Sequence, residues 1–329
     1  MPIPNEILYL TEDDVQQTLT VAEAVDLAEK GIKADAAGNV EGDKFYMNVN
    51  DDGFIKPFSG YMAGEEYAYV KSFSYFPGNP RKFKRATTSS QVILIDHETG
   101  LPACFMRADW VTGLKTAAST AVTTSVLARP ESNTVTIFGA GTLGRLHLMA
   151  LAERFTLKKA YYVDILPEAA TKCASELQEK LGFSVEAVTL DNREDAVRKS
   201  DIVFTVTTGN QELVYLDWLK PGVFLARLGS YQEVHLDVIT GADKVVLDRW
   251  KYVSPRIPEV IQLIKEGKFS REHVYAEWPD IVGGRVPGRE SKEENIVFIA
   301  LGIWGEYAAI LPEVYRRARE KGLGQPLPF

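Results

Sequence analysis

Three glycines in this chain have the spacing of a dinucleotide-binding loop. Residues 135–144 read VTIFGAGTLG, where Gly139, Gly141 and Gly144 follow an apolar, β-branched segment and precede a stretch compatible with a helix. In such a loop the first glycine permits a tight turn, the second lets backbone approach a pyrophosphate, and the third lets helix and strand pack closely. The helix N-terminus adds unpaired N–H groups for the phosphates. We therefore predict a cofactor cradle that also includes Ala140, Thr142 and Leu143.

An acidic residue completes this pattern. Asp164 follows Gly144 by 20 residues, at the end of an expected strand over residues 159–164. A carboxylate at this point accepts hydrogen bonds from both ribose hydroxyls and repels a 2′-phosphate, so we predict NAD(H) in preference to NADP. A glycine turn with a purely structural role is the weaker alternative, because strand, helix and acid occur together.

A lysine is the second candidate for chemistry. The segment 67–76 reads YAYVKSFSYF, and strand alternation puts Lys71 on an aromatic face. A lysine there is costly unless it is functional or paired, because burial disfavours its charged form. A solvent-facing lysine on an exposed sheet face is the alternative, and the pattern alone leaves both open. The aromatic residues on the same face are Tyr67, Tyr69, Phe73 and Tyr75.

The elements that position these residues fall into two groups, which meet near residue 130. The first half has strand-like alternation and few helices, which predicts an antiparallel sheet. We expect strands over residues 7–10, 45–50, 54–61, 67–76, 91–95 and 103–106, and helices over 20–37 and 109–128. The second half alternates strands and helices, as a parallel, doubly wound sheet does. We expect its strands over residues 134–138, 160–163, 184–189, 201–206, 223–228 and 244–247.

The predicted fold is thus α/β: a Rossmann doubly wound parallel sheet plus an α+β substrate-binding and dimerisation domain. Residues 294–321 have a helical pattern interrupted by Pro312, and we expect this stretch to fold back onto the first half. The expected domains are 1–120 with 300–329, and 121–299. Because a nicotinamide ring lies at the carboxyl edge of such a sheet, in the crevice facing the other domain, substrate residues should come mainly from residues 40–120.

The composition of the chain limits the kinds of partner that it can bind. The chain has 329 residues, is 45% hydrophobic and 25% charged, and has a net charge of −8. It is therefore long enough for two cores, and it offers no basic surface for nucleic acid or an anionic membrane. No apolar run approaches the roughly 20 residues that span a bilayer, and no segment resembles a signal peptide, so we expect a cytoplasmic location. Two cysteines and four scattered histidines have no metal-ligand spacing, and we expect no metal.

Five motifs add up to a resemblance that covers nearly the whole chain. In order, they are VKSFSYFPGNP, VILIDHETGLPACFM, TGLKTAAST, VTIFGAGTLGRLHL and DIVFTVTT. Together they resemble the ornithine cyclodeaminase/mu-crystallin family, which includes cyclodeaminases, archaeal-type alanine dehydrogenase, imine and ketimine reductases, and hormone-binding crystallins. The resemblance implies a homodimer formed by the first domain, and a substrate amine or imine held between Lys71 and the nicotinamide ring.

The resemblance also implies roles for three lysines. Lys71 matches the family's catalytic lysine, which would hold the substrate carboxylate and relay a proton at the imine nitrogen; this needs a lowered pKa. Lys44 stands where the family usually has a carboxylate-binding arginine, although a surface lysine remains an alternative. Lys115 matches the arginine that touches substrate and cofactor phosphate. Both lysines are departures, because lysine is a point charge instead of a bidentate fork.

Further cofactor contacts follow from the same motifs. Thr87 matches a threonine that hydrogen-bonds the pyrophosphate, with an ordinary strand threonine as the alternative. Thr205, Val206 and Thr207 match backbone and hydroxyl groups that line the adenosine ribose and the nicotinamide side, although these hydroxyls could instead cap the following turn.

Two departures bear on the reaction. The family's cyclodeaminases carry an aspartate after the glycine that follows the fifth Rossmann strand, whereas Gly229 is followed here by SYQE, with no aspartate. The sequence therefore lacks a base for ring closure at this position. In the same segment, we expect Glu233 to start a helix and Tyr231 to cover the nicotinamide pocket. Arg107 stands where aspartate is common, and we favour a structural pair with Asp109 over contact with a second acidic group of the substrate.

The function that follows is an NAD(H)-dependent oxidoreductase acting on a small 2-imino or 2-amino acid, an imine reductase or amino-acid dehydrogenase. An ornithine-type cyclodeaminase with catalytic NAD is the first alternative. A non-catalytic, crystallin-like binder of NAD or small molecules is the second.

Overall fold

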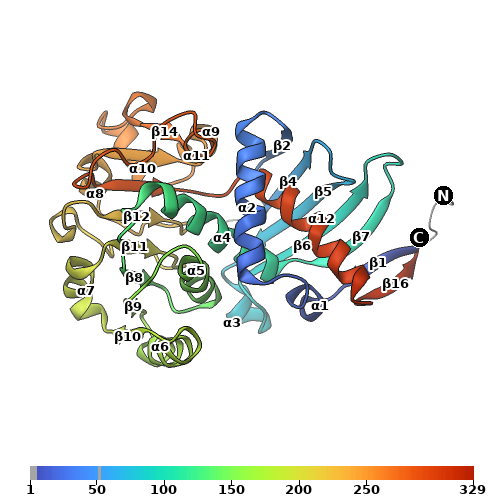
Figure 1. The fold of residues 1–329 in the computed structure, drawn as a ribbon, viewed down its shortest axis with the longest axis horizontal. Helices are drawn as coiled ribbons and strands as arrows, with labels where there is room; N and C mark the ends of the chain where they lie inside the picture. Colours follow the sequence, from blue (N-terminus) through green and yellow to red (C-terminus); the bar gives the residue numbers. More distant parts are fainter. Residues whose placement is uncertain (1–5, 51–52) are drawn as a thin grey trace. The chain divides into compact units, whose positions relative to one another are not determined.

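The computed structural model describes residues 6–50 and 53–329, which form two compact units (Figure 1). Unit 1 comprises Met1–Lys115 and Trp304–Phe329, and unit 2 comprises Thr116–Ile303. The domain boundaries expected from the sequence, 120/121 and 299/300, lie a few residues from these.

Unit 1 is built on a mixed sheet with the strand order β16-β1-β7-β6-β5-β4-β2, with β3 paired to β4. Neighbouring strands are antiparallel, as the sequence predicts, except β1 and β7, which are parallel. The strands are β1 (Glu6–Leu10), β2 (Val40–Lys44), β3 (Met47–Asn48), β4 (Phe54–Met62), β5 (Tyr67–Tyr75), β6 (Thr88–Asp96), β7 (Pro102–Arg107) and β16 (Gln325–Pro328).

The strand expected over residues 45–50 also needs correction. The paired segment is β2, in register from Val40 opposite Met62 to Lys44 opposite Phe58, and only Met47 and Asn48 pair again afterwards. The apolar side chains that suggested a strand are exposed, Phe45 at 60%. Backbone pairing with β4, and not side-chain alternation, therefore determines where this strand lies.

Two long helices cover one face of the unit 1 sheet: α2 (Val21–Ala36) and α12 (Gly305–Glu320), shown in blue and red in Figure 1. They cross at two glycines, since a Cβ added to Gly31 would lie 2.3 Å from the carbonyl oxygen of Gly305. Helix α2 begins with a capping box, in which the Thr20 hydroxyl accepts a hydrogen bond from the Glu23 N–H. The two short helices are α1 (Glu12–Gln16) and α3 (Asn79–Phe83).

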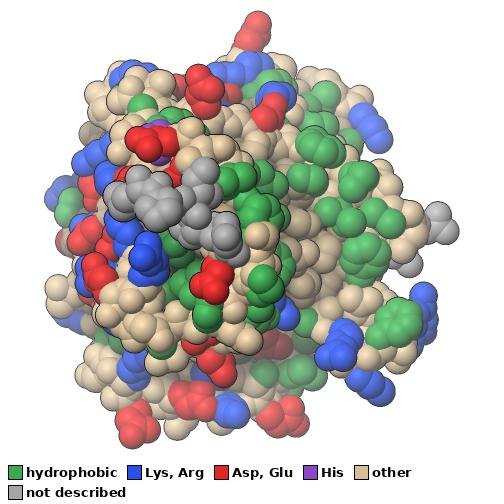
Figure 2. All heavy atoms as spheres, turned by 90° about the vertical axis from the view of Figure 1, so that its right-hand side faces the viewer, with side chains coloured by type: hydrophobic (Ala, Val, Ile, Leu, Met, Phe, Trp, Pro, Cys, Tyr) green, Lys and Arg blue, Asp and Glu red, His purple; other side chains and the backbone are tan. Residues whose placement is uncertain are grey.

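The other face of this sheet leaves apolar side chains in contact with solvent. Val70 and Ile93, which are paired across β5 and β6, are 42% and 39% exposed. Figure 2 shows hydrophobic side chains gathered on the side of unit 1 that it draws. An exposed apolar area on a sheet face is typical of an interaction surface.

Unit 2 is the expected Rossmann-like unit, with an all-parallel sheet in the order β10-β9-β8-β11-β12-β15-β13-β14. The strands are β8 (Thr134–Phe138), β9 (Lys159–Val163), β10 (Ser184–Val188), β11 (Ile202–Thr205), β12 (Phe224–Arg227), β13 (Lys244–Leu247), β14 (Ala276–Glu277) and β15 (Ile296–Ile299). The helices are α5 (Thr142–Ala152), α6 (Pro167–Leu181), α7 (Arg193–Lys199), α8 (Leu236–Thr240), α9 (Trp250–Val253), α10 (Pro258–Lys265) and α11 (Trp278–Val282); α4 (Asp109–Leu127) starts in unit 1 and continues in unit 2. The predicted α/β class is confirmed.

The helix expected over residues 294–321 was wrong at its start. Ile296–Ile299 is the wholly buried strand β15, which lies between β12 and β13, and the helix α12 begins only at Gly305. A run of four buried β-branched and aromatic residues is what a central parallel strand requires. Pro312 lies inside α12 without ending it.

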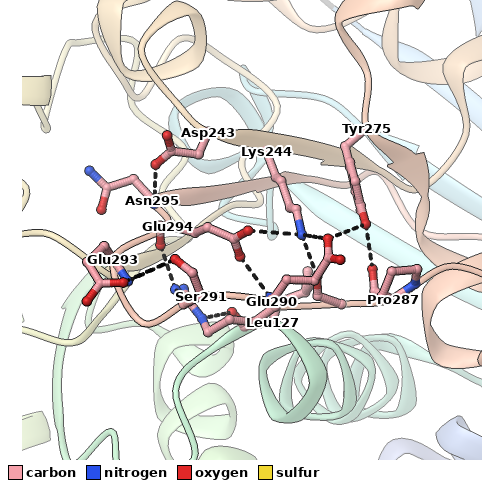
Figure 3. A network of polar contacts seen from close by, with 12 residues as sticks. Leu127, Asp243, Lys244, Tyr275, Pro287, Glu290, Ser291, Glu293, Glu294 and Asn295 are labelled. Atoms are coloured by element: carbon pink, nitrogen blue, oxygen red, sulfur yellow. Dashed lines mark hydrogen bonds and ion pairs between the residues drawn. The ribbon is translucent and has the colours of Figure 1, made fainter.

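A polar network joins the segment before β15 to Lys244, the first residue of β13 (Figure 3). The Lys244 ammonium donates to the carbonyl of Gly288 at 2.9 Å and to Glu290 at 2.6 Å, and it pairs with Glu294 at 3.2 Å. Burial opposes the charge of Lys244, but the two carboxylates outweigh it and raise its pKa. No helix within the described ranges is long and apolar enough to cross a membrane.

Candidate active site

The glycine loop of unit 2 has the geometry that its sequence predicts. Gly139 directly follows β8 with φ +107°, and a Cβ there would lie 2.8 Å from the Val206 carbonyl oxygen. At Gly144 a Cβ would lie 1.9 Å from the Gly139 oxygen, so any side chain would push α5 away from the strand. A Cβ on Gly141 would meet nothing within 4 Å. The first and third glycines are thus required by packing, whereas the second faces open space that a ligand can enter.

The loop ends at an available helix N-terminus. Gly141 is the N-cap of α5 and carries no capping side chain, so the first-turn N–H groups are open to an anion. Asp164 lies directly after β9; it accepts the Ala140 N–H at 2.8 Å and the Leu166 N–H at 2.9 Å. The carboxylate therefore holds the glycine loop in place, and its remaining lone pairs can accept ribose hydroxyls. These residues fit a dinucleotide.

The segment at the ends of β11 and β12 contains a buried carboxylate that we had expected to start a helix. Glu233 is wholly buried, and α8 begins only at Leu236. Its oxygens accept four hydrogen bonds, from the Thr205 hydroxyl at 2.8 Å, the Thr207 hydroxyl and N–H at 2.7 Å each, and the Gly229 N–H at 2.8 Å. The Thr205 and Thr207 hydroxyls therefore already donate hydrogen bonds within the protein. Contact between the cofactor and the backbone atoms of residues 205–207 remains a prediction.

A second carboxylate extends this network. Glu259 accepts the Glu233 N–H at 2.9 Å and forms a 3.0 Å ion pair with Arg227, both side chains being wholly buried. Arg227 also donates to the carbonyls of Gly229 and Tyr231. The sequence signal that could have revealed this network is Arg227 itself, since a charge inside an apolar strand requires a buried partner.

Lys71 lies on the covered face of the unit 1 sheet, so the solvent-facing alternative was wrong. It is 1% exposed, its ammonium donates to the Ser90 hydroxyl at 3.3 Å, and the ring centroids of Phe58, Phe73 and Tyr307 lie within 5.4 Å of it. Burial, assisted by repulsion from Lys115, lowers the pKa of Lys71 to about 7, although Asp109 opposes the shift. This is the lowered pKa that proton transfer near neutrality needs.

The other two predicted lysines are buried beside the same rings. Lys44 is 3% exposed with its ammonium 5.4 Å from the Phe58 centroid, so it is not a surface lysine. Lys115 forms a 3.1 Å ion pair with Glu306 and lies 4.7 Å from the Tyr307 centroid. The structure thus brings Lys44, Lys71 and Lys115 together.

A fourth lysine belongs to this cluster, and sequence reasoning missed it. The half-buried Lys56 has its ammonium 5.0 Å from the centroids of both Phe58 and Phe73. Its signal was the same alternation that identified Lys71, because Lys56 and Phe58 are two residues apart on one strand.

Two further predicted residues, Arg107 and Thr87, lie in unit 1. Arg107 pairs with Asp109 at 2.7 Å, as expected, and Asp109 in turn accepts the Ser90 N–H at 2.7 Å. Thr87 precedes β6 and is half-buried, with its carbonyl accepting the Phe76 N–H at 2.8 Å. Its contact with a pyrophosphate stays a prediction.

Comparison with known proteins decides the family. The sequence profile of the ornithine cyclodeaminase/mu-crystallin family matches residues 5–322. The chain belongs to this family. It is 28% identical over 98% of its length to N-((2S)-2-amino-2-carboxyethyl)-L-glutamate dehydrogenase of Staphylococcus aureus, 98% of which is covered.

Solved structures of the family share the fold. Δ1-pyrroline-2-carboxylate reductase of Thermococcus litoralis, in complex with NADH and L-proline, superimposes with a TM-score of 0.92 at 28% identity, covering 98% of this chain and 100% of the other. An archaeal alanine dehydrogenase dimer with bound NAD has a TM-score of 0.91 at 27% identity, covering 98% and 99%. The family resemblance seen in the sequence is confirmed, and the two solved relatives, a reductase and a dehydrogenase, have NADH and NAD bound.

Proposed function

We propose that this family member is an NAD(H)-dependent oxidoreductase acting on a small 2-imino or 2-amino acid, as an imine reductase or an amino-acid dehydrogenase. The observation that carries the proposal is Lys71, wholly buried among cations and aromatic rings, with a pKa near neutrality. Its near relatives reduce imines or oxidise amino acids, according to their names.

The three lysines have different roles toward the substrate. Lys44 and Lys115 supply buried positive charge for the α-carboxylate, which is worth more in a low-dielectric site than in water. Lys71 is present in both protonation states near pH 7, so it can give a proton to the substrate nitrogen or remove one. When bound, the nicotinamide ring supplies or accepts the hydride at the neighbouring carbon.

We assign the cofactor as NAD(H) because of Asp164. Its carboxylate follows β9 beside the glycine loop, where a 2′-phosphate would meet negative charge. The exposed apolar face around Val70 and Ile93 supports a homodimer formed by unit 1. Two buried free thiols, Cys104 and Cys173, are consistent with the cytoplasm.

The cyclodeaminase alternative lacks a base. The segment between Gly229 and Glu233 contains no aspartate, and the Glu233 carboxylate is wholly buried and accepts four hydrogen bonds from the protein. A non-catalytic binder would have no use for the lowered pKa of Lys71.

The test is turnover by the purified chain. NADH or NADPH is mixed with cyclic imines, or with 2-oxo acids plus ammonia or methylamine, and absorbance at the nicotinamide band is followed. We expect NADH oxidation with at least one substrate class and a preference for NADH over NADPH. Ammonia and proline formed from ornithine without net NADH change would establish the lyase, and cofactor binding without any turnover would establish the binder.

A further inference from the structure

Lys71 has a hydroxyl group on the neighbouring strand as its hydrogen-bond partner. Phe73 of β5 stands opposite Ser90 of β6, and alternation puts Lys71, Phe73 and Ser90 on one face of the sheet. The Lys71 ammonium donates to the Ser90 hydroxyl at 3.3 Å, and both residues are 1% exposed. Within residues 6–50 and 53–329, this is the single hydrogen bond of the Lys71 side chain.

A hydroxyl suits a lysine that changes its charge. It accepts a hydrogen bond from an ammonium and, after turning about its C–O bond, donates one to a neutral amine, whereas a carboxylate or a carbonyl can only accept. The Ser90 hydroxyl has no second hydrogen-bond partner in the described part of the chain, so its proton is free to turn. The aromatic rings around Lys71 attract only its charged form. Ser90 can therefore hold the lysine nitrogen whether or not that nitrogen is charged.

Asp109 fixes the position of Ser90. One oxygen of its carboxylate accepts the Ser90 N–H at 2.7 Å, and the other accepts a hydrogen bond from Arg107 at 2.7 Å. Asp109 is also the first residue of α4, and its N–H donates to Glu12 at 3.3 Å. The carboxylate thus joins the strand that carries Ser90 to the start of α4. Ser90 is consequently held at its backbone, while its hydroxyl proton can still turn.

The negative charge of Asp109 also acts on Lys71. It raises the pKa of Lys71, against the lowering effects of burial and of Lys115. The Lys71 nitrogen and the nearer Asp109 oxygen are at most about 10 Å apart, because each is hydrogen-bonded to Ser90. The other charged or titratable groups on the elements packed around Lys71 are Tyr69 on β5, Lys44 on β2, Lys56 on β4, and Glu306 and Tyr307 on α12.

We propose that the Ser90 hydroxyl holds the Lys71 nitrogen both before and after proton transfer, and that Asp109 fixes Ser90 for this task, so that both are positioning residues of the reaction. The proposal rests on the function proposed above, since it concerns the proton of that same reaction. In imine reduction, one proton passes from the Lys71 nitrogen to the substrate nitrogen while hydride reaches the neighbouring carbon, and Lys71 is left as a neutral amine. The Ser90 hydroxyl then turns and donates to this amine, which keeps the nitrogen in place until it takes up another proton.

The first experiment removes the hydroxyl. Ser90→Ala and Ser90→Thr are compared with the wild type, and Ser89→Ala is the matched control, because it removes the neighbouring hydroxyl on the opposite face of β6. The pKa of Lys71 is measured by an NMR pH titration of the cofactor-free protein with 13C-labelled lysine side chains, and Lys71→Met identifies the signal. The kcat and KM for imine or oxo-acid reduction with saturating NADH are measured across the same pH range.

We expect Ser90→Ala to lower the pKa of Lys71 by about half a unit or more, because the hydrogen bond of the charged ammonium is stronger than that of the neutral amine. The kcat should fall about tenfold, its decrease at high pH should begin at a correspondingly lower pH, and the KM should stay within about twofold. Ser90→Thr keeps the hydroxyl and should restore most of the pKa and the kcat, and Ser89→Ala should resemble the wild type. A wild-type pKa or a wild-type kcat in Ser90→Ala, or the same losses in Ser89→Ala, would overturn the proposal.

The second experiment separates the charge of Asp109 from its ion pair. Asp109→Asn removes the negative charge and keeps an oxygen that can accept the Ser90 N–H, whereas Arg107→Gln breaks the same ion pair and leaves the charge. We expect Asp109→Asn to lower the pKa of Lys71 by about half a unit or more, since a charge at most about 10 Å away acts on it even when water screens part of the interaction. Arg107→Gln should leave this pKa unchanged or raise it. An unchanged pKa in Asp109→Asn, or an equal decrease in both variants, would overturn the role of Asp109.

The NMR titrations test the positioning roles independently of turnover. If the wild type turns over no imine or oxo acid, the proposed function fails, and the titrations of Ser90→Ala and Asp109→Asn still decide whether these two residues act on Lys71. Turnover by the wild type together with unchanged titrations in both variants would overturn the positioning roles and leave the oxidoreductase function standing.

Discussion

The pKa of Lys71 depends on the charge of Lys115, and this dependence can be measured. Both ammonium groups lie about 5 Å from the ring centroid of Tyr307, so the two nitrogens are at most about 10 Å apart. Repulsion from Lys115 is one of the two causes that lower the pKa of Lys71 to about 7. Lys115→Met removes this charge and keeps an unbranched side chain of similar length, so we expect the pKa of Lys71 to rise.

The size of the rise follows from Coulomb's law. Two unit charges at this largest separation of about 10 Å repel each other by roughly 1.7 kcal/mol at an effective dielectric constant of about 20, so the pKa should rise by about one pH unit or more. Glu306, the ion-pair partner of Lys115, acts in the same direction, because its negative charge then favours a protonated Lys71. We therefore expect a pKa of about 8 or above in Lys115→Met.

The assay is a pH titration by NMR of cofactor-free protein labelled with [ε-13C]lysine. The spectrum of Lys71→Met identifies the resonance of Lys71, and Lys115→Arg is the control, since it keeps the charge and should keep the pKa near 7. An unchanged or lower midpoint in Lys115→Met would refute the electrostatic coupling, and a wild-type midpoint near 10.5 would refute the buried environment itself.

Three further predictions follow. Lys71 keeps its proton in the unfolded chain up to about pH 10.5 but releases it near pH 7 in the folded protein. Between pH 7 and 9 the unfolding free energy of the wild type should therefore rise, relative to that of Lys71→Met, by about 1.4 kcal/mol per pH unit. Urea denaturation that gives the same pH dependence of the unfolding free energy for both proteins would contradict this. Glu233→Gln replaces an acceptor of four hydrogen bonds by a group with one acceptor oxygen. We expect this variant to have an unfolding free energy about 2–3 kcal/mol lower than the wild type and to bind NADH more weakly, as measured by fluorescence. Unchanged values of both quantities would show that the network is dispensable. Asp164→Ala should narrow the ratio of kcat/KM for NADH over NADPH by about tenfold or more, and a constant ratio would rule out the role of this carboxylate in cofactor choice.

Local sequence patterns were sufficient to predict the position and the role of the glycine loop. Gly139, Gly141 and Gly144 could be assigned from the sequence because their roles depend on a strand, a turn and a helix that are contiguous in the chain. The same holds for the Arg107–Asp109 pair, whose partners are two residues apart.

Features that depend on distant segments could not be assigned. Alternation in β5 put Lys71 on an aromatic face, but the burial of that face comes from α12, more than two hundred residues away. Glu233 could not be recognised as an acceptor, because the strands that supply its donors are arranged only by the fold. The short run Ile296–Ile299 has no period that separates a buried strand from a buried helix.

We propose that Lys71 gives or removes a proton in an NAD(H)-dependent reaction at a carbon–nitrogen bond. The most direct test of this proposal is the turnover number of Lys71→Met with saturating NADH and the best imine or oxo-acid substrate, measured together with NADH binding by fluorescence. We predict that turnover is abolished while the dissociation constant of NADH stays within about twofold, since the glycine loop and Asp164 belong to unit 2. Retained turnover, or loss of NADH binding together with turnover, would contradict the account.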